Sequence, residues 1–314
     1  MFTFNLSAAR AARTQDAPAA RRSKRRLLQL GVAAAALALA APTTTAPAQA
    51  ATPKIIVGAV GDATGLSSKV GAHLAYHGYG SLTGKVPNAK MVNMGSGVSW
   101  HTVATAKAGS STYNNIVRWA KTLKARPGVT LFAFHHEPEG ATSKHYGTAS
   151  DFIAAYRHVV DIFRAQGVHN VEYTWQMTSW AFATKPSASN YAAKWYPGDS
   201  YVDNVGTDPY NWVNCGPGSG KWQSLQFVMD PSLKFARAHH KKVVVAEWAS
   251  QSGSRRAQWV RDAKAYFVAN QSVIRAVFYF QFSLRSACFF KLNTAAEYSA
   301  MRSMATDTAH FTTS

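Results

Sequence analysis

Glutamate stands out in this sequence for its scarcity and its placement. The chain has five glutamates, and three of them follow two of its most apolar short segments. Residues 131–139 read Leu-Phe-Ala-Phe-His-His-Glu-Pro-Glu, and residues 243–248 read Val-Val-Val-Ala-Glu-Trp. An apolar strand that ends in a carboxylate must present that charge to water or to a substrate, because an unpaired buried charge is costly. Glu137 and Glu247 are therefore candidate acids, bases or nucleophiles.

The alternation of side chains along a strand predicts the orientation of both carboxylates. The odd-numbered residues of 131–137 would share one strand face, and those of 243–247 would share one face of another strand. Two carboxylates that face one cavity can hydrolyse a glycosidic bond, since one protonates the leaving oxygen while the other attacks the anomeric carbon or activates water. The alternative is that each glutamate forms an ion pair at a strand terminus.

Short apolar segments alternate with amphipathic ones after residue 50. The segments expected to be strands are 55–60, 90–94, 101–106, 129–135, 171–175, 202–206, 243–247 and 274–280. Helical spacing of apolar residues predicts helices at 112–125, 152–165, 225–239, 255–269 and 294–304. The strands are almost continuously apolar, which is typical of strands covered on both faces by helices.

This succession predicts an α/β protein with a single (β/α)8 TIM barrel, because such barrels repeat a strand and a helix eight times in about 250 residues. An open doubly wound sheet is the alternative. That fold usually carries a glycine-rich phosphate turn after its first strand, and residues 58–62 lack the GxGxxG spacing. In a barrel, the carboxyl ends of the strands form the active-site face.

The first fifty residues have the layout of an export signal. A basic block at residues 21–26 precedes an uncharged apolar stretch at 27–41, and the segment ends in Ala-Gln-Ala. The stretch is shorter than the roughly 20 residues of a membrane-spanning helix, so no membrane anchor is expected. We expect residues 1–50 to be removed on export, by the twin-arginine or the general secretory route, and residues 51–314 to form the secreted barrel.

The charge and the cysteines limit the function classes. Lysine and arginine number 34 against 15 aspartates and glutamates, a formal charge of +19, but no dense basic run follows the predicted signal. We interpret the charge as a soluble surface, with attraction to an anionic glycan as the alternative, and expect no nucleic-acid binding. Cys215 and Cys288 are too few for a multi-cysteine zinc site, and no metal or cofactor is expected. Outside the cytoplasm they can form a disulfide, two separate buried thiols being the alternative.

Three segments resemble family 26 of the glycoside hydrolases, the β-mannanase family. Residues 134–139, Phe-His-His-Glu-Pro-Glu, are similar to its acid/base motif on strand four, which has His-Glu where most relatives in the same barrel clan have Asn-Glu. Residues 202–210 resemble its strand six, and residues 242–250 resemble its nucleophile segment on strand seven.

The resemblance implies roles for four residues. Glu137 would be the acid/base, Glu247 the nucleophile, His136 a group that positions or tunes Glu137, and Tyr210 a hydrogen-bond donor to Glu247. It also implies retention of anomeric configuration through a covalent glycosyl-enzyme, for which the two carboxyl groups lie about 5–5.5 Å apart. A raised pKa of Glu137, which burial can supply, would keep it protonated, whereas a protonated His136 nearby would oppose this.

Aromatic rings stack on the flat C–H faces of sugars, so rings at strand ends are candidate binding residues. The candidates for substrate binding are His135, Trp175, Trp212, Trp248 and Phe280. Each could instead be a core residue. Glu139 is interpreted as a solvent-exposed loop charge rather than a sugar-binding residue.

The expected function is that of a secreted, monomeric, retaining endo-glycoside hydrolase acting on a mannan-type or related β-linked polysaccharide. Residues 140–146 lack the tryptophans that the mannanases carry after the acid/base motif, so the polysaccharide is left open. A barrel with weak or lost catalysis that binds extracellular carbohydrate is the second candidate. An esterase or peptidase is disfavoured, because neither a Gly-x-Ser-x-Gly elbow nor a His-Glu-x-x-His motif is present.

Overall fold

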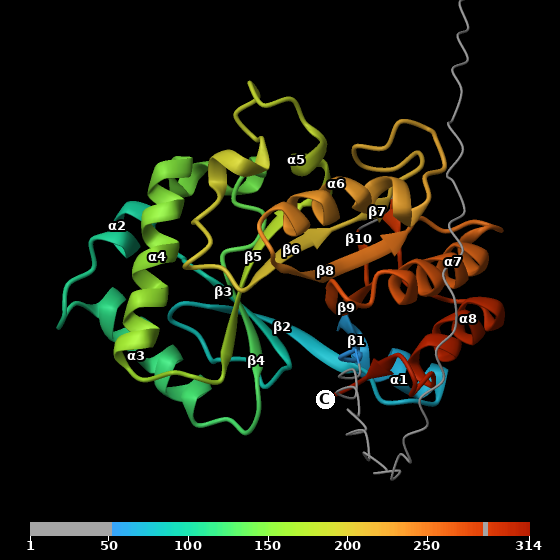
Figure 1. The fold of residues 1–314 in the computed structure, drawn as a ribbon, viewed down its shortest axis with the longest axis horizontal. Helices are drawn as coiled ribbons and strands as arrows, with labels where there is room; N and C mark the ends of the chain where they lie inside the picture. The colour runs from blue at the N-terminus through green and yellow to red at the C-terminus, as the bar shows by residue number, and fades with distance from the viewer. Residues whose placement is uncertain (1–51, 285–287) are drawn as a thin grey trace, which may run out of the picture. The chain divides into compact units, whose positions relative to one another are not determined.

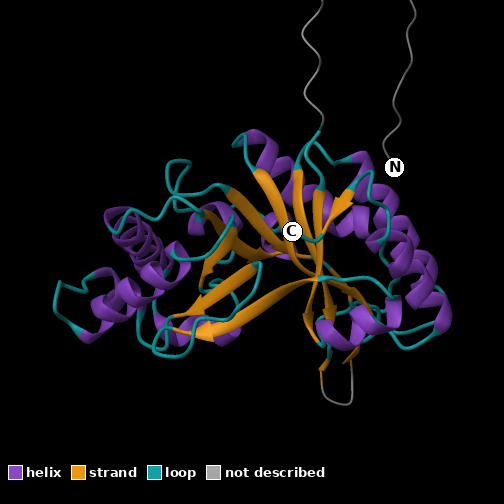
Figure 2. Cartoon of the chain, turned by 90° about the horizontal axis from the view of Figure 1, so that it is seen from below, coloured by secondary structure: helices purple, strands orange, loops and turns teal. Residues whose placement is uncertain are grey.

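The computed structural model describes residues 52–284 and 288–314, so the predicted export signal lies outside the described residues. Parallel strands close into a barrel with helices around it (Figures 1 and 2), which confirms the predicted single (β/α)8 fold. The barrel strands, in order around the ring, are β1 (Ile55–Gly61), β2 (Ala75–Ser81), β3 (Met91–Gly95), β4 (Thr130–Phe134), β5 (Val171–Thr178), β6 (Asn204–Asp208), β8 (Lys242–Ser250) and β9 (Ile274–Gln281). Pairing of β9 with β1 closes the ring.

The helices that were predicted are present, with bounds within three residues of those expected. The helical elements are α1 (Ala63–Val70), α2 (Trp100–Ala104), α3 (Ser111–Lys124), η1 (Ala141–Tyr146), α4 (Ala149–Ala165), α5 (Ser179–Ala183), η2 (Ala192–Trp195), α6 (Leu225–Ala238), α7 (Arg256–Ala269) and α8 (Ala295–Ala305). Capping boxes begin two of them: Thr148 and Asp151 exchange side-chain and backbone hydrogen bonds at α4, and Thr294 and Glu297 do so at α8. Short strands complete the chain: β7 (Tyr210–Asn211), β10 (Ser283–Leu284), β11 (Cys288–Phe289) and β12 (Phe311–Thr312).

The prediction of a strand at residues 101–106 was wrong, and the true second strand was missed. Residues 100–104 form α2, whose first turn is capped by the Ser99 hydroxyl, 3.1 Å from the Thr102 amide nitrogen. The second strand, β2, reads Ala-Tyr-His-Gly-Tyr-Gly-Ser and lacks an apolar run. Its glycines serve close packing, since a Cβ at Gly78 would lie 2.7 Å from a side-chain atom of Pro87.

Two apolar clusters define the inside and the outside of the barrel. The interior cluster consists of Ile56, Ala75, Met91, Leu131, Ala133, Val244, Ala246, Ala276 and Phe278. Leu131 and Ala133 face inward as predicted, but on β8 the prediction was wrong, because Val243 and Val245 pack among the residues beneath the helices.

A β-bulge in β8 explains how Glu247 nevertheless reaches the mouth of the barrel. Val245 pairs with Val277 and Trp248 pairs with Tyr279, so two residues of β8 oppose a single residue of β9. A bulge of this kind changes the alternation of side chains and re-aims one of them. Glu247, one of the two bulged residues, accepts hydrogen bonds from residues of β2 and β7.

A disulfide joins Cys215, in the loop after β7, to Cys288 in β11, with a Cα–Cα distance of 5.4 Å, which confirms the predicted pairing. The bond spans 73 residues of sequence and ties two loops at the carboxyl ends of the strands. In the described part of the chain, no helix combines the length and hydrophobicity that crossing a membrane requires.

We expect the double substitution Cys215→Ser and Cys288→Ser to lower the free energy of unfolding by about 2–4 kcal/mol, since a cross-link over a long loop restricts the unfolded chain. Urea unfolding without reductant measures the loss. A reductant should destabilise the wild type by the same amount and leave the double variant unaffected. Equal unfolding midpoints for wild type and variant would show that the bond contributes nothing to stability.

Candidate active site

Glu247 is buried at the mouth of the barrel and is held by two tyrosines. The Tyr79 hydroxyl, from β2, donates to Oε1, and the Tyr210 hydroxyl, from β7, donates to Oε2. Burial raises the pKa of Glu247, whereas the two tyrosine hydrogen bonds lower it and favour the carboxylate. The predicted bond from Tyr210 is confirmed. Tyr79 was missed because it lies on the strand that the sequence pattern did not predict.

A buried histidine contacts the backbone of the residue that precedes Glu247. The Nδ1 atom of His77 is 3.0 Å from the carbonyl oxygen of Ala246, the other bulged residue of β8. Burial lowers the pKa of His77 to about 3, so the ring is neutral and can donate from Nδ1. This contact ties β2 to the bulge that aims Glu247.

Glu137 follows β4 and has the electrostatics of a proton donor. Its backbone has a φ of 46°, in the left-handed region, and its amide nitrogen is 3.1 Å from the carbonyl oxygen of Gln176. Burial raises the pKa of Glu137 to about 8, the negative charges of Glu247 and Glu139 add to the shift, and a hydrogen bond with Asp208 opposes it. At neutral pH the carboxyl group is therefore mostly protonated, the state that a general acid requires.

Asp208, at the end of β6, is a third carboxyl group of this cluster and was not singled out from the sequence. Burial raises its pKa well above the ordinary value, and the charges of Glu247 and Glu137 add to the shift. Gln176 Nε2 lies 2.9 and 3.1 Å from its two carboxyl oxygens, and Asn93 Nδ2 lies 3.1 Å from Gln176 Oε1. Asp208 in turn lowers the pKa of Glu137 through a side-chain hydrogen bond, so the two carboxyl groups influence each other's protonation. The available signal for Asp208 was its place in the Asp-Pro-Tyr segment that also contains Tyr210.

His136 packs against Tyr79, one of the two donors to Glu247. The two rings are 4.9 Å apart, edge to face. Burial lowers the pKa of His136 to about 4, so the ring is neutral at neutral pH and does not oppose protonation of Glu137. Its catalytic role stays a prediction.

The structure places His135 in a buried, hydrogen-bonded position beside β4, and its predicted contact with sugar stays a prediction. Its Nδ1 lies 3.2 Å from Ser96 Oγ and its Nε2 lies 3.1 Å from Ser143 Oγ, so both ring nitrogens have partners. The ring packs edge-on against Trp100 and Tyr146, at 5.0 and 4.6 Å. A φ of 50° at this residue interrupts the strand alternation on which the prediction depended.

Glu139 is not an exposed loop charge, as was expected. It is buried, and its Oε1 accepts hydrogen bonds from the backbone amide (2.9 Å) and the hydroxyl group (2.5 Å) of Thr178. Burial raises the pKa of Glu139 to about 7, and the hydrogen bonds from Thr178 limit the shift. Glu139 thus ties the segment that follows β4 to the end of β5.

Trp175 and Trp248 were wrongly predicted to line the cleft, since both are fully buried under the helices. The Trp175 ring contacts Phe182 of α5 at 5.7 Å and Phe235 of α6 at 5.5 Å. The Trp248 ring stacks on Trp259 of α7 at 5.7 Å. Both lie on the outward face of their strands, where helices cover them and no substrate can reach.

Trp212 and Phe280 are partly exposed and lie beside the site. Their rings are 4.9 and 5.6 Å from that of Tyr210, which donates to Glu247. They therefore remain candidates for sugar contacts, and their binding role stays a prediction.

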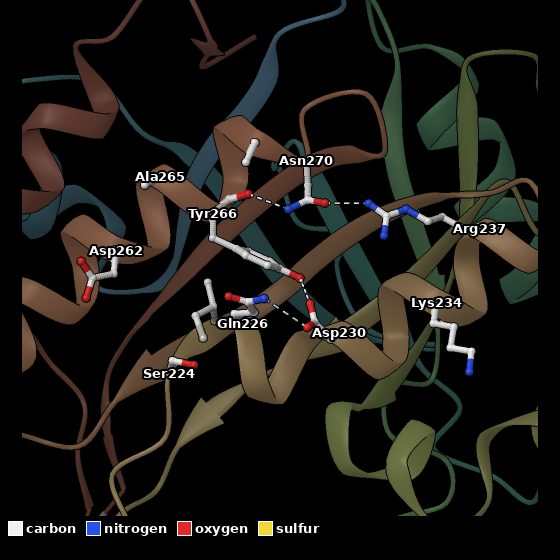
Figure 3. Close-up of a pocket in the computed structure, with 11 residues that line it drawn as sticks. Ser224, Gln226, Asp230, Lys234, Arg237, Asp262, Ala265, Tyr266 and Asn270 are labelled. Carbon is white, nitrogen blue, oxygen red and sulfur yellow. Dashed lines mark hydrogen bonds between the residues drawn. The ribbon is translucent and has the colours of Figure 1, made fainter. Parts of the chain in front are cut away.

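Cavities occur both beside and away from the carboxyl cluster. One of about 670 Å³ is lined by Tyr210 and Trp212. Another, of about 800 Å³, lies between α6 and α7 (Figure 3), and its lining includes none of the clustered carboxyl groups. Its polar side chains bond to one another, as in the 2.7 Å contact of the Tyr266 hydroxyl with Asp230. Within residues 52–284 and 288–314, no group of three or more histidine, cysteine, aspartate and glutamate side chains is arranged to hold a metal ion.

The fold and the site together define a (β/α)8 barrel whose buried carboxyl groups gather at the carboxyl ends of β4, β6 and β8. Residues 93–285 match the model of glycosyl hydrolase family 26, which is more than half of the chain. The chain therefore belongs to glycosyl hydrolase family 26, as the resemblance of its motifs indicated.

Curated relatives and solved structures agree with this membership. Endoglucanase H of Acetivibrio thermocellus is 31% identical over 173 residues, which are 52% of this chain and 19% of the relative. A β-1,3-xylanase of a Vibrio species is 24% identical over 188 residues, or 60% of this chain and 37% of the relative. The chain thus spans less than half the length of either protein.

The fold resembles solved mannanase domains of the same family. The catalytic domain of an endo-β-1,4-mannanase from Bacillus sp. JAMB-750 has a TM-score of 0.57 at 17% identity, covering 82% of this chain and 87% of that one. A β-mannanase from Bacteroides ovatus has a TM-score of 0.55 at 15% identity, covering 82% and 90%.

We expect Glu137→Gln to stabilise the protein relative to the wild type increasingly as the pH rises from 5 to 9. Folding raises the pKa of Glu137 from 4.5 to about 8, so the stability linked to its proton is complete below pH 4.5 and is lost as the pH passes 8. Glutamine has no proton to lose. Urea unfolding midpoints at three pH values measure the effect.

Glu172→Gln provides a control of opposite sign. Although burial opposes it, the bonds from Arg275 lower the pKa of Glu172, so that its contribution to stability is present above pH 4.5 and lost in acid. This variant should be less stable than the wild type at neutral pH. A pH-independent difference for Glu137→Gln would contradict the raised pKa.

Proposed function

We propose that this protein is a secreted, retaining endo-glycoside hydrolase that cleaves a β-linked polysaccharide, with Glu137 as acid/base and Glu247 as nucleophile. The observation that carries the proposal is that Glu137, whose pKa burial raises to about 8, belongs to the same buried cluster as Glu247, whose two oxygens accept hydrogen bonds from Tyr79 and Tyr210. In this proposal Glu137 holds the proton and Glu247 carries the charge, as a double displacement requires.

In the first step, a Glu247 oxygen attacks the anomeric carbon while Glu137 transfers its proton to the glycosidic oxygen. The bond between the anomeric carbon and that oxygen breaks, the shortened chain leaves as an alcohol, and the sugar remains as an ester on Glu247. Tyr79 and Tyr210 would hold the attacking carboxylate in one orientation, because each occupies one of its oxygens.

In the second step, Glu137 acts as a base. Esterification removes the negative charge of Glu247, and this charge is one of the causes of the raised pKa of Glu137. The pKa of Glu137 therefore falls once the intermediate forms, and the carboxylate can accept a proton from water. The water oxygen attacks the anomeric carbon, Glu247 leaves, and both residues return to their starting states.

The names of the relatives support a β-glycan as the substrate class, since they describe an endoglucanase, a β-1,3-xylanase and β-mannanases. The disulfide and the predicted signal at residues 1–50 support secretion, because disulfides persist outside the cytoplasm. Incubation with β-mannan, mixed-linkage β-glucan, cellulose and β-1,3-xylan, followed by proton NMR of the first products, tests the proposal. Release of the β-anomer from internal bonds is expected; the α-anomer would overturn double displacement, and no release from any glycan would overturn hydrolysis.

Replacement of Glu247 by alanine should reduce polysaccharide cleavage by at least about a thousandfold, because the attacking oxygen is lost. The release of reducing sugar measures the rate of cleavage. Azide should restore turnover of an activated aryl glycoside, giving the inverted glycosyl azide, because it enters the space that the carboxylate vacates. Glu172→Gln, at the start of β5, should keep normal turnover. Near-normal activity of Glu247→Ala would exclude it as the nucleophile.

The Glu137→Gln enzyme should fail most on substrates whose leaving group needs a proton. We expect kcat/KM to fall by about 10²–10⁴-fold on polysaccharide and far less on an aryl glycoside with an acidic phenol. Steady-state kinetics on both substrates provides the comparison. A loss of equal size on the two would remove Glu137 from the acid role.

A further inference from the structure

Two large aromatic side chains remain exposed near the mouth of the barrel. Trp180, in α5, is 43% exposed, and Phe227, in the first turn of α6, is 65% exposed. Both line the cavity of about 670 Å³ that also contacts Tyr210 and Trp212. Grouped aromatic surface of this kind, left in water, marks a binding site more often than a scattered single ring does.

This cavity continues into a second one along the same two helices. The second cavity, of about 700 Å³, shares Ala183, Phe227 and Pro231 with the first and extends to Tyr191 and Phe235. α5 and α6 lie next to each other (Figure 1). We call the combined depression the α5–α6 groove. Tyr210, the donor to Glu247, lines the first cavity, so the groove begins at a residue that contacts the carboxyl cluster.

The lining of the α5–α6 groove suits a chain of sugar rings. Aromatic faces fit the apolar C–H faces of pyranoses, and scattered polar side chains can meet the hydroxyl groups at their edges. Ser179 and Gln223 line the inner part, and Asp230 and Lys234 line the outer part. With one acid and one base, the outer part has no charge excess that would favour an ionic ligand.

The floor and one wall of the groove are held by the fold. Phe182 and Phe235 pack on the buried ring of Trp175, at 5.7 and 5.5 Å, which fixes the base of the outer part. The loop that carries Trp212 is tied by the disulfide from Cys215. A preformed surface loses little entropy when it binds an extended ligand.

We propose that the α5–α6 groove binds sugar units of the β-glycan chain remote from the bond that is cleaved. This rests on the proposed function. Trp180 and Phe227 are its aromatic platforms, and the groove makes catalytic efficiency depend on substrate length, because only a long chain reaches from Glu247 past Tyr210 to α6.

Kinetics with Trp180→Ala and Phe227→Ala tests the proposal. For each variant, the ratio of kcat/KM on the preferred polysaccharide to kcat/KM on an aryl β-glycoside of two sugar units should fall by about tenfold, as for truncation of an aromatic anchor. Tyr76→Ala is the matched control, since Tyr76 is 41% exposed but lies beside α1, and its ratio should equal that of the wild type. Affinity gel electrophoresis in a Glu247→Ala background gives a second readout, in which either groove variant should migrate faster through the polysaccharide.

The outcomes separate the groove from the active site. An unchanged ratio together with unchanged gel mobility would overturn the groove while leaving the hydrolase intact. Equal losses on long and short substrates would also overturn it, because they would indicate damage to the catalytic centre. If the wild type neither cleaves nor binds any glycan of the panel, the proposed function fails first and the groove proposal with it.

Discussion

The structure depends on the cost of placing three carboxyl groups in one buried space. Glu137, Asp208 and Glu247 come from separate parts of the barrel; burial raises the pKa of all three, and the charges of neighbouring carboxyl groups add to the shift for Glu137 and Asp208. Hydrogen bonds offset part of this cost: two tyrosine hydroxyls donate to Glu247, and the side-chain amide of Gln176 donates to Asp208. Because these donors lie on β2, β5 and β7, the cluster can exist only when the barrel is closed.

The same electrostatic coupling links the two halves of the proposed reaction. The charge of Glu247 helps to keep Glu137 protonated. When Glu247 is esterified in the intermediate, that charge is lost and the pKa of Glu137 falls, so Glu137 serves first as acid and then as base without a conformational change. The neutral rings of His77 and His136 add no charge that would disturb this balance. Two tryptophans close together in the sequence have different environments. Trp175 is buried and supports the helix layer, whereas Trp180 is exposed in the α5–α6 groove.

Much of the fold could be predicted from periodicity. The apolar runs at β1, β4, β8 and β9 and the amphipathic pattern of the long helices were sufficient, because these segments bury continuous surface. β2 was not predicted, because its residues serve tertiary contacts rather than an apolar run: its glycines allow the close approach of Pro87, His77 bonds to the Ala246 carbonyl, and Tyr79 bonds to Glu247. Strand parity failed at β8 and after β4, where a bulge and left-handed backbone at His135 and Glu137 redirect the chain.

The sequence by itself determined the barrel class, the family, the bond from Tyr210 and the partnership of Cys215 with Cys288, and it singled out Glu137 and Glu247 as the candidate pair. These follow from local patterns and from motifs that few folds share. Only the tertiary structure decided that Tyr79, Asp208 and Gln176 join the site, that Trp175 and Trp248 are core, and that Trp180 and Phe227 line a groove. Burial, shared protons and cavity walls are properties of residues brought together from distant strands, and no local pattern of residues encodes them.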